Sequence, residues 1–211
     1  MTIHLRKMYV DCRFGQLHMH TSFPSSGGFD ELTPLVCLPP QSQTGRLYRP
    51  LLRDLGRDRS VYAPDLPGAG ESDAPDHPPT VADFAGACCD LLDSLRLKHV
   101  DVVAYQTGSL AAIEFALARP QQVRRLALIG VPSSDSGYQV GERLPLLDRK
   151  LRAIALDGAE SMDLIGEAAR SLGPRGRLVV THAPADAAAR IGAAGLAILA
   201  EQDGTVVAER R

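Results

Sequence analysis

One short stretch of the chain combines residue types and a position that could support chemistry. The segment AYQTG at 104–108 follows an apolar run at 100–103 and precedes an Ala/Leu-rich stretch at 109–117. This order predicts a strand, a sharp turn and a helix. Such a turn can expose a nucleophilic serine in the pattern G-x-S-x-G. Here Gln106 takes the centre. Its amide is not a nucleophile near neutral pH, so the usual covalent chemistry is not expected at this side chain.

The elements around this turn alternate between strands and helices. Short apolar runs bounded by turn residues predict strands at 35–38, 60–63, 100–104 and 126–130, and two more within 7–23. Helices are expected at 47–55, 80–95 and 107–118. The second of these helices begins with the capping box Thr80–Asp83. The alternation predicts an α/β fold with a mostly parallel central sheet and helices on both faces.

The pattern is weaker after Pro132. A loop is expected at 133–141, followed by helices at 144–156 and 161–172 and a strand at 176–181. The stretch 187–200 is rich in Ala and Gly, and its end at 195–200 fits a strand.

Three segments, in the same order, resemble the α/β-hydrolase superfamily. LVCLPPQ at 35–41 stands where the family has a strand ending in His-Gly. APDLPGAGESDAP at 63–75 resembles the family's D-x-x-G-x-G-x-S loop, and it is the most specific match because it is long and well spaced. VDVVAYQTGSLAA at 100–112 stands where the family carries its nucleophile elbow, and the next strand follows at 124–132.

The resemblance implies one α/β-hydrolase-like domain over residues 1–211. Its core would be 35–132, its C-terminal part 133–211 would be divergent, and the cap would be reduced or absent. Specificity in this family depends on the cap, so the sequence does not identify the substrate.

The departures from the family pattern concern the catalytic positions. Family members carry Ser, Asp or Cys where Gln106 stands, and His-Gly where Pro39-Pro40 stands. The resemblance places the two backbone N–H groups of the oxyanion hole at Gln41 and Thr107. It therefore implies a family-level hydrolase of ester-like small molecules with a degenerate triad and no serine-hydrolase activity. The alternative is a non-catalytic scaffold that binds a small molecule or a protein.

The acid and the base of the triad have two alternative placements. In the first, the segment 196–211 resembles the strand and loop that deliver the acid, with Asp203 in that role, and the chain ends before the last strand and the histidine. In the second, 154–156 is the strand, Asp157 is the acid and His182 is the base. We favour the first placement because its motif is the better match.

Other reactive residue types have structural interpretations. His18 and His20 alternate on an expected strand, but no further ligand stands at metal-binding spacing, so exposed strand histidines and no metal site are expected. The cysteines Cys12, Cys37, Cys88 and Cys89 form no C-x-x-C motif, so we expect buried free thiols. No Gly-rich loop follows the first strand of the core, and no cofactor is expected.

Composition excludes some functions. Hydrophobic residues make up 45%, charged residues 23%, and the net charge is −2. This balance gives no electrostatic reason to expect nucleic acid or an anionic membrane as a partner. The N-terminus has no apolar signal segment, and no apolar run could span a bilayer, so a cytoplasmic protein is expected. The expected partner is a small apolar or carbonyl-containing molecule, and an open sheet edge could allow a homodimer.

Overall fold

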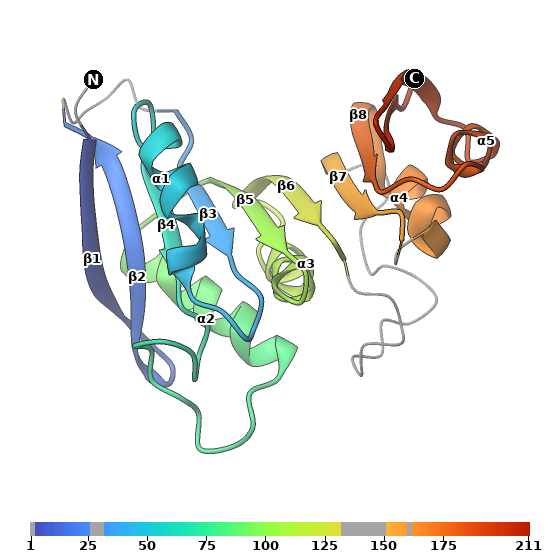
Figure 1. Ribbon diagram of the computed structural model, residues 1–211. Helices are drawn as coiled ribbons and strands as arrows, with labels where there is room; N and C mark the ends of the chain where they lie inside the picture. Colours follow the sequence, from blue (N-terminus) through green and yellow to red (C-terminus); the bar gives the residue numbers. More distant parts are fainter. Residues whose placement is uncertain (1–2, 26–31, 132–150, 160–161) are drawn as a thin grey trace. The chain divides into compact units, whose positions relative to one another are not determined.

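The structure is a computed structural model that describes residues 3–25, 32–131, 151–159 and 162–211. These residues form two compact units, one within 1–124 and the other within 125–211 (Figure 1). The loop expected at 133–141 and the beginning of the helix expected at 144–156 lie outside the described residues. The single domain expected over the whole chain stays a prediction.

The first unit contains a mixed sheet with the strand order β1-β2-β4-β3-β5. Its strands are β1 (Ile3–Cys12), β2 (Gly15–Pro24), β3 (Leu35–Leu38), β4 (Val61–Pro64) and β5 (Val100–Tyr105). Strands β1 and β2 form the expected antiparallel hairpin, and β2 pairs antiparallel with β4. Strand β3 lies parallel to both β4 and β5, as the βαβ pattern predicts.

The helices of this unit largely match the sequence pattern. They are the 3-10 helix η1 (Gly45–Tyr48) and the α-helices α1 (Arg49–Leu55), α2 (Val81–Ser94) and α3 (Gly108–Ala118). The helix expected at 47–55 is thus divided into η1 and α1, with a proline in the first turn of α1, where its missing N–H is tolerated. The expected capping box is present: Asp83 N donates to Thr80 Oγ1 at 3.2 Å, and Thr80 N donates to Asp83 Oδ2 at 2.8 Å.

Both faces of the first sheet are covered. On one face, Leu35, Cys37, Val61 and Ala63 pack in a single cluster with Tyr48 of η1 and Leu52 of α1. The alternate residues of the same strands, such as Val36 and Leu38, are buried as well. Helices α2 and α3 pack on each other, and α3 contacts β3 and β5. The expected arrangement of helices on both faces is therefore found in this unit.

The second unit contains a sheet with the order β6-β7-β8-β10-β9. Its strands are β6 (Val123–Ile129), β7 (Leu151–Asp157), β8 (Leu172–Thr181), β9 (Ala197–Gln202) and β10 (Thr205–Glu209). Its helices are η3 (Met162–Leu164), α4 (Ile165–Ser171) and α5 (Ala187–Ala193). Strands β6, β7 and β8 run parallel, whereas β10 is antiparallel to β8 and to β9.

The prediction of a helix at 144–156 is wrong for the described residues 151–156, because they form strand β7. Ile154 and Leu156 are buried, whereas Ala153 and Ala155, which alternate with them, are only half-buried. This alternation has the two-residue period of a strand. The apolar residues of so short a run fit a helix and a strand equally well.

The two faces of the second sheet differ in their burial. Residues on one face are buried, and helices α4 and α5 contact the sheet through β8, β9 and β10. On the other face, Ala153, Ala155, Val179 and Val207 are half-buried. In the described part of the chain, no helix is long and apolar enough to cross a membrane.

Candidate functional site

The turn between β5 and α3 presents Gln106 in an unusual backbone conformation. Its φ is +48°, which lies in the left-handed region that few residues other than glycine occupy. Ser109 N donates to Gln106 O at 2.8 Å and closes the turn, while the Gln106 side chain is exposed. A sharp and strained turn from strand to helix is the geometry of a nucleophile elbow. The chain keeps this backbone and carries an amide at its tip.

The first residue of α3 lies against the end of β3. A Cβ atom on Gly108 would come within 2.4 Å of Pro39 O and 2.6 Å of Leu38 O. No side chain fits there, so a glycine at this position allows the helix to start directly beside the loop after β3.

The residues expected at the oxyanion hole do come together, but with a contact that the sequence did not indicate. Gln41 N donates to Thr107 Oγ1 at 2.9 Å. The hydroxyl of Thr107 thus links the loop after β3 to the elbow. A ligand oxygen that accepted the same N–H would have to share it with this hydroxyl or displace it.

Ser109 is the second residue of α3 rather than part of the bend. Ser109 is fully buried within the first turn of α3, and its Oγ has no hydrogen-bond partner among the described residues. Its structural role agrees with the sequence pattern, which places it on the helix rather than at the turn.

Asp65, which follows β4, is buried, and its Oδ2 accepts from Glu71 N in the loop after this strand at 3.2 Å. Its Oδ1 accepts from Gly45 N at 2.7 Å, and its Oδ2 lies 2.8 Å from His18 Nδ1. His18 is 1% exposed and Asp65 is 2% exposed, so the expectation that His18 is an exposed strand residue is wrong. A buried imidazole needs a hydrogen-bonding partner, and the sequence did not show that Asp65 would supply it.

The second unit brings Asp157 and His182 together. Asp157 ends β7 and His182 follows β8, so both lie at the carboxyl ends of neighbouring parallel strands. His182 Nδ1 lies 3.3 Å from Asp157 Oδ1, and Ala159 N donates to the same oxygen at 3.0 Å. The side chain of His182 is 76% exposed and that of Asp157 33%. This pairing has the geometry of the second placement of the acid and the base.

The loops after β7 and β8 approach each other closely. Gly158 N donates to Thr181 O at 2.6 Å, and a Cβ atom on Gly158 would lie 2.8 Å from His182 O. Only a residue without a side chain fits between them, which holds the aspartate and the histidine side by side.

Asp203 lies in the tight turn between β9 and β10. Both central residues, Asp203 and Gly204, have positive φ values of +48° and +70°. Such a pair is typical of a two-residue hairpin turn. Gly204 O accepts from Ala183 N at 2.7 Å, so the turn contacts the loop that carries His182. The carboxylate that contacts the His182 ring is that of Asp157.

The described residues contain no group of three or more His, Cys, Asp or Glu side chains that could hold a metal ion. The assignments of Gln106, Gln41, Thr107, His182 and Asp203 to catalytic or binding roles stay predictions.

Comparison with known proteins supports the family resemblance. Residues 33–192 match the family model described as alpha/beta hydrolase fold. An uncharacterised protein of Mycobacterium tuberculosis is 36% identical over 97 residues, which are 46% of this chain and 28% of that protein. The 2-hydroxy-6-oxo-2,4-heptadienoate hydrolase of Pseudomonas putida is 36% identical over 88 residues, which are 39% of this chain and 30% of that enzyme.

An uncharacterised carboxylesterase of Bacillus subtilis is 25% identical over 128 residues, which are 60% of this chain and 41% of that protein. Among solved structures, the naproxen esterase of Bacillus subtilis has a TM-score of 0.54 and 23% identity, with 65% of this chain and 48% of that chain covered. Cfl2 of Burkholderia cenocepacia has a TM-score of 0.52 and 28% identity, with 62% and 42% covered.

The chain thus spans less than half the length of each of these proteins. The family model, however, matches well over half of this chain, from strand β3 to helix α5. The chain belongs to the α/β hydrolase fold family.

Proposed function

We propose that this protein binds a small ester- or carbonyl-containing molecule at the elbow without forming a covalent intermediate. The observation that supports the proposal is the amide of Gln106 at a left-handed turn between β5 and α3. The backbone geometry suits the presentation of a reacting group, but an amide cannot attack a carbonyl carbon. Its N–H₂ group can instead donate a hydrogen bond to a carbonyl oxygen.

The class of ligand is suggested by the relatives. Their names include a carboxylesterase and a 2-hydroxy-6-oxo-2,4-heptadienoate hydrolase, whose substrates carry ester or carbonyl groups. Because the chain matches only part of each relative, the ligand class is a proposal for this protein. Amide donors such as Gln106 and the backbone N–H of Thr107 are suited to an uncharged carbonyl oxygen.

A fluorophosphonate probe tests the absence of covalent chemistry, because it labels activated serine nucleophiles. We expect the natural protein to remain unlabelled and the variant Gln106→Ser to gain labelling. Gln106→Ala is the matched control, since it shortens the side chain without adding a hydroxyl. Labelling of the natural protein would contradict the proposal, and equal labelling of the serine and alanine variants would show that a serine at this turn is not activated.

A second candidate function is hydrolysis by an activated water molecule. It is favoured by the 3.3 Å contact between His182 Nδ1 and Asp157 Oδ1, which orients the ring and leaves its Nε2 atom free to accept a proton. In this reaction the water oxygen bonds to the ester carbonyl carbon, its proton passes to Nε2, and the alcohol leaves with that proton. No bond to the protein is formed.

Steady-state kinetics with p-nitrophenyl esters test this second candidate. A general base contributes about a hundredfold or more, so His182→Asn is expected to lower kcat/KM by that factor. Unchanged turnover in His182→Asn would reject the mechanism.

A further inference from the structure

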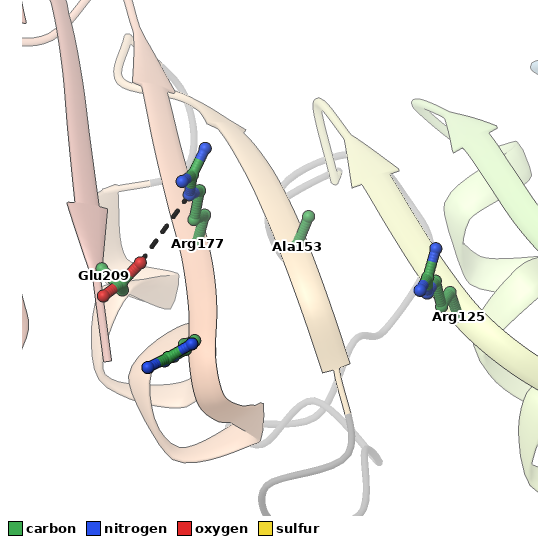
Figure 2. Close-up of a pocket in the computed structure, with 5 residues that line it drawn as sticks. Arg125, Ala153, Arg177 and Glu209 are labelled. Carbon is green, nitrogen blue, oxygen red and sulfur yellow. Dashed lines mark ion pairs between the residues drawn. The ribbon is translucent and has the colours of Figure 1, made fainter. Parts of the chain in front are cut away.

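An open hollow lies on the half-buried face of the second unit's sheet (Figure 2). Its volume is about 750 Å³, which is within the range of small-molecule binding sites. The residues that line it are Arg125, Ala153, Arg175, Arg177 and Glu209. Three of these five residues are arginines, so the hollow is strongly cationic.

The order of the strands explains how the hollow forms. Ala153 of β7 pairs in register with Arg177 of β8, and Arg177 pairs with Glu209 of β10. Figure 2 shows Ala153 between Arg177 on one side and Arg125 of β6 on the other. The side chain of Ala153 is only a methyl group, so β7 forms the bottom of the hollow between the longer side chains of its two neighbouring strands. The two flanking strands are two spacings apart, about 10 Å, which the long arginine side chains can bridge.

A bulge in β8 adds the third arginine. Leu151 of β7 pairs with Leu172, but Ala153 pairs with Arg177, so β8 contains extra residues at this point. Arg175 lies among them with a φ of +58°, and its N–H donates to Arg210 O at 2.9 Å. Bulges redirect side chains, and a left-handed residue other than glycine is strained. Arg175 thus combines a strained backbone with a side chain that lines the hollow.

The charges in the hollow are not balanced. Glu209 is the one carboxylate among the five lining residues, and its Oε2 lies 3.8 Å from Arg177 Nε. This ion pair is long, and the Arg177 side chain is 62% exposed. Two further guanidinium groups have no carboxylate opposite them in the lining. The excess of positive charge matches a doubly charged anion better than a singly charged one.

We propose that this hollow binds the phosphate group of a small molecule. Guanidinium groups donate two parallel hydrogen bonds to the oxygens of a phosphate, and arginines on both sides of Ala153 would hold it from opposite directions. The hollow is larger than the phosphate alone, which leaves room for an organic group above the half-buried apolar residues of the same face.

The site is separate from the predicted catalytic positions of this unit. Arg177 precedes His182 by five residues along β8 and its following loop, a distance of about 17 Å in an extended chain. Binding of phosphate is therefore expected to leave the Asp157–His182 contact undisturbed. This separation also makes the phosphate site independent of the proposed function.

Isothermal titration of the full chain with inorganic phosphate at low salt tests the proposal. We expect saturable binding that weakens about tenfold or more in Arg125→Gln and in Arg177→Gln, since each removes a charge-assisted hydrogen bond. Glu209→Gln should have the opposite effect and strengthen binding, because it removes the carboxylate that competes for Arg177. Arg53→Gln is the matched control: it removes the same charge from an exposed arginine of α1 and should leave the affinity unchanged.

Titration with acetate distinguishes a phosphate site from a carboxylate site. Acetate is expected to bind more weakly than phosphate, and tighter binding of acetate would overturn the assignment. The proposal would also be overturned by an absence of saturable phosphate binding in the natural protein, or by an affinity that is the same in Arg125→Gln, Arg177→Gln and Arg53→Gln. The opposite signs expected for Glu209→Gln and Arg177→Gln separate site-specific binding from a general loss of folded protein.

Discussion

At the scale of single residues, the elbow depends on the absence of a side chain at the start of α3. A Cβ atom on Gly108 would overlap the carbonyl oxygens of Pro39 and Leu38 at 2.4 and 2.6 Å. Gly108→Ala is therefore expected to lower the free energy of unfolding by about 3 kcal/mol, measured by urea denaturation. The control is Gly166→Ala in α4, where nothing lies within 4 Å of the new Cβ atom and helix propensity should raise stability by up to about 1 kcal/mol. Equal effects of the two variants on stability would contradict the close approach of Gly108 to the carbonyl oxygens of Pro39 and Leu38.

The hydroxyl of Thr107 makes the second residue-scale contact, because it accepts the N–H of Gln41. Thr107→Val keeps the shape but removes the acceptor, and it is expected to cost about 1 to 2 kcal/mol of stability. Thr107→Ser retains the hydroxyl and should lose less. Urea denaturation of the three proteins checks the order, and a valine variant as stable as the serine variant would show that the contact contributes nothing.

These two contacts also show what sequence reasoning can reach at this scale. The sequence predicted Gln106 at a bend, and the resemblance to the α/β-hydrolase family implied that Gln41 and Thr107 lie near each other. It did not show that the Gln41 amide donates to Thr107, nor that His18 is buried against Asp65. Such contacts join residues far apart in the chain, and residue types alone do not determine which donors and acceptors pair.

At the scale of elements, β1 is fastened to the loop after β4 by a carboxylate. Glu71 accepts from Tyr9 Oη at 2.6 Å and from Lys7 Nζ at 2.9 Å. The hydrogen bond from Tyr9, followed by that from Lys7, lowers the pKa of Glu71 from its ordinary 4.5 to about 2. The same hydrogen bond raises the pKa of the Tyr9 hydroxyl.

The lowered pKa of Glu71 predicts a pH dependence of stability. A group whose pKa is depressed by folding stabilises the native state above its unfolded pKa and loses this contribution as the pH falls through the folded value. The stabilisation by Glu71 should thus be complete above a pH of 4.5 and disappear as the pH approaches 2. Urea denaturation across this range should show a shallower fall for Glu71→Gln than for the natural protein. Identical pH profiles would mean that this exposed cluster adds nothing.

Element boundaries were predictable where local signals agreed. The capping box fixed the start of α2, and apolar runs between turn residues located β3, β4 and β5. The region of β7 was assigned to a helix at 144–156, and only the second placement of the acid and the base took 154–156 as a strand, because its apolar residues are too few to separate a period of 2 from one of 3.6. The hairpin of β9 and β10 was missed as well, since the Asp203-Gly204 turn that joins them was interpreted as a catalytic loop.

At the scale of the whole molecule, the boundary between the two compact units falls inside a single strand. The first unit ends at Arg124 and the second begins at Arg125, whereas β6 runs from Val123 to Ile129. The sequence-based prediction of one domain over residues 1–211 requires that the chain unfold cooperatively.

The cysteines allow the prediction of cooperative unfolding to be measured. All four lie in the first unit, and burial raises the pKa of the Cys37 and Cys88 thiols, so both should react slowly in the native state. The variant Val206→Cys adds a reporter to the second unit, at a position that is 1% exposed in β10. Valine and cysteine are similar in size, so little strain is expected.

Pulsed alkylation at increasing urea concentrations, with each cysteine peptide quantified by mass spectrometry, then gives one midpoint per unit. We expect the midpoints of Cys37, Cys88 and the cysteine at position 206 to coincide, as the prediction of one domain requires. A lower midpoint in the second unit alone would show that each unit unfolds by itself and that the chain contains two domains.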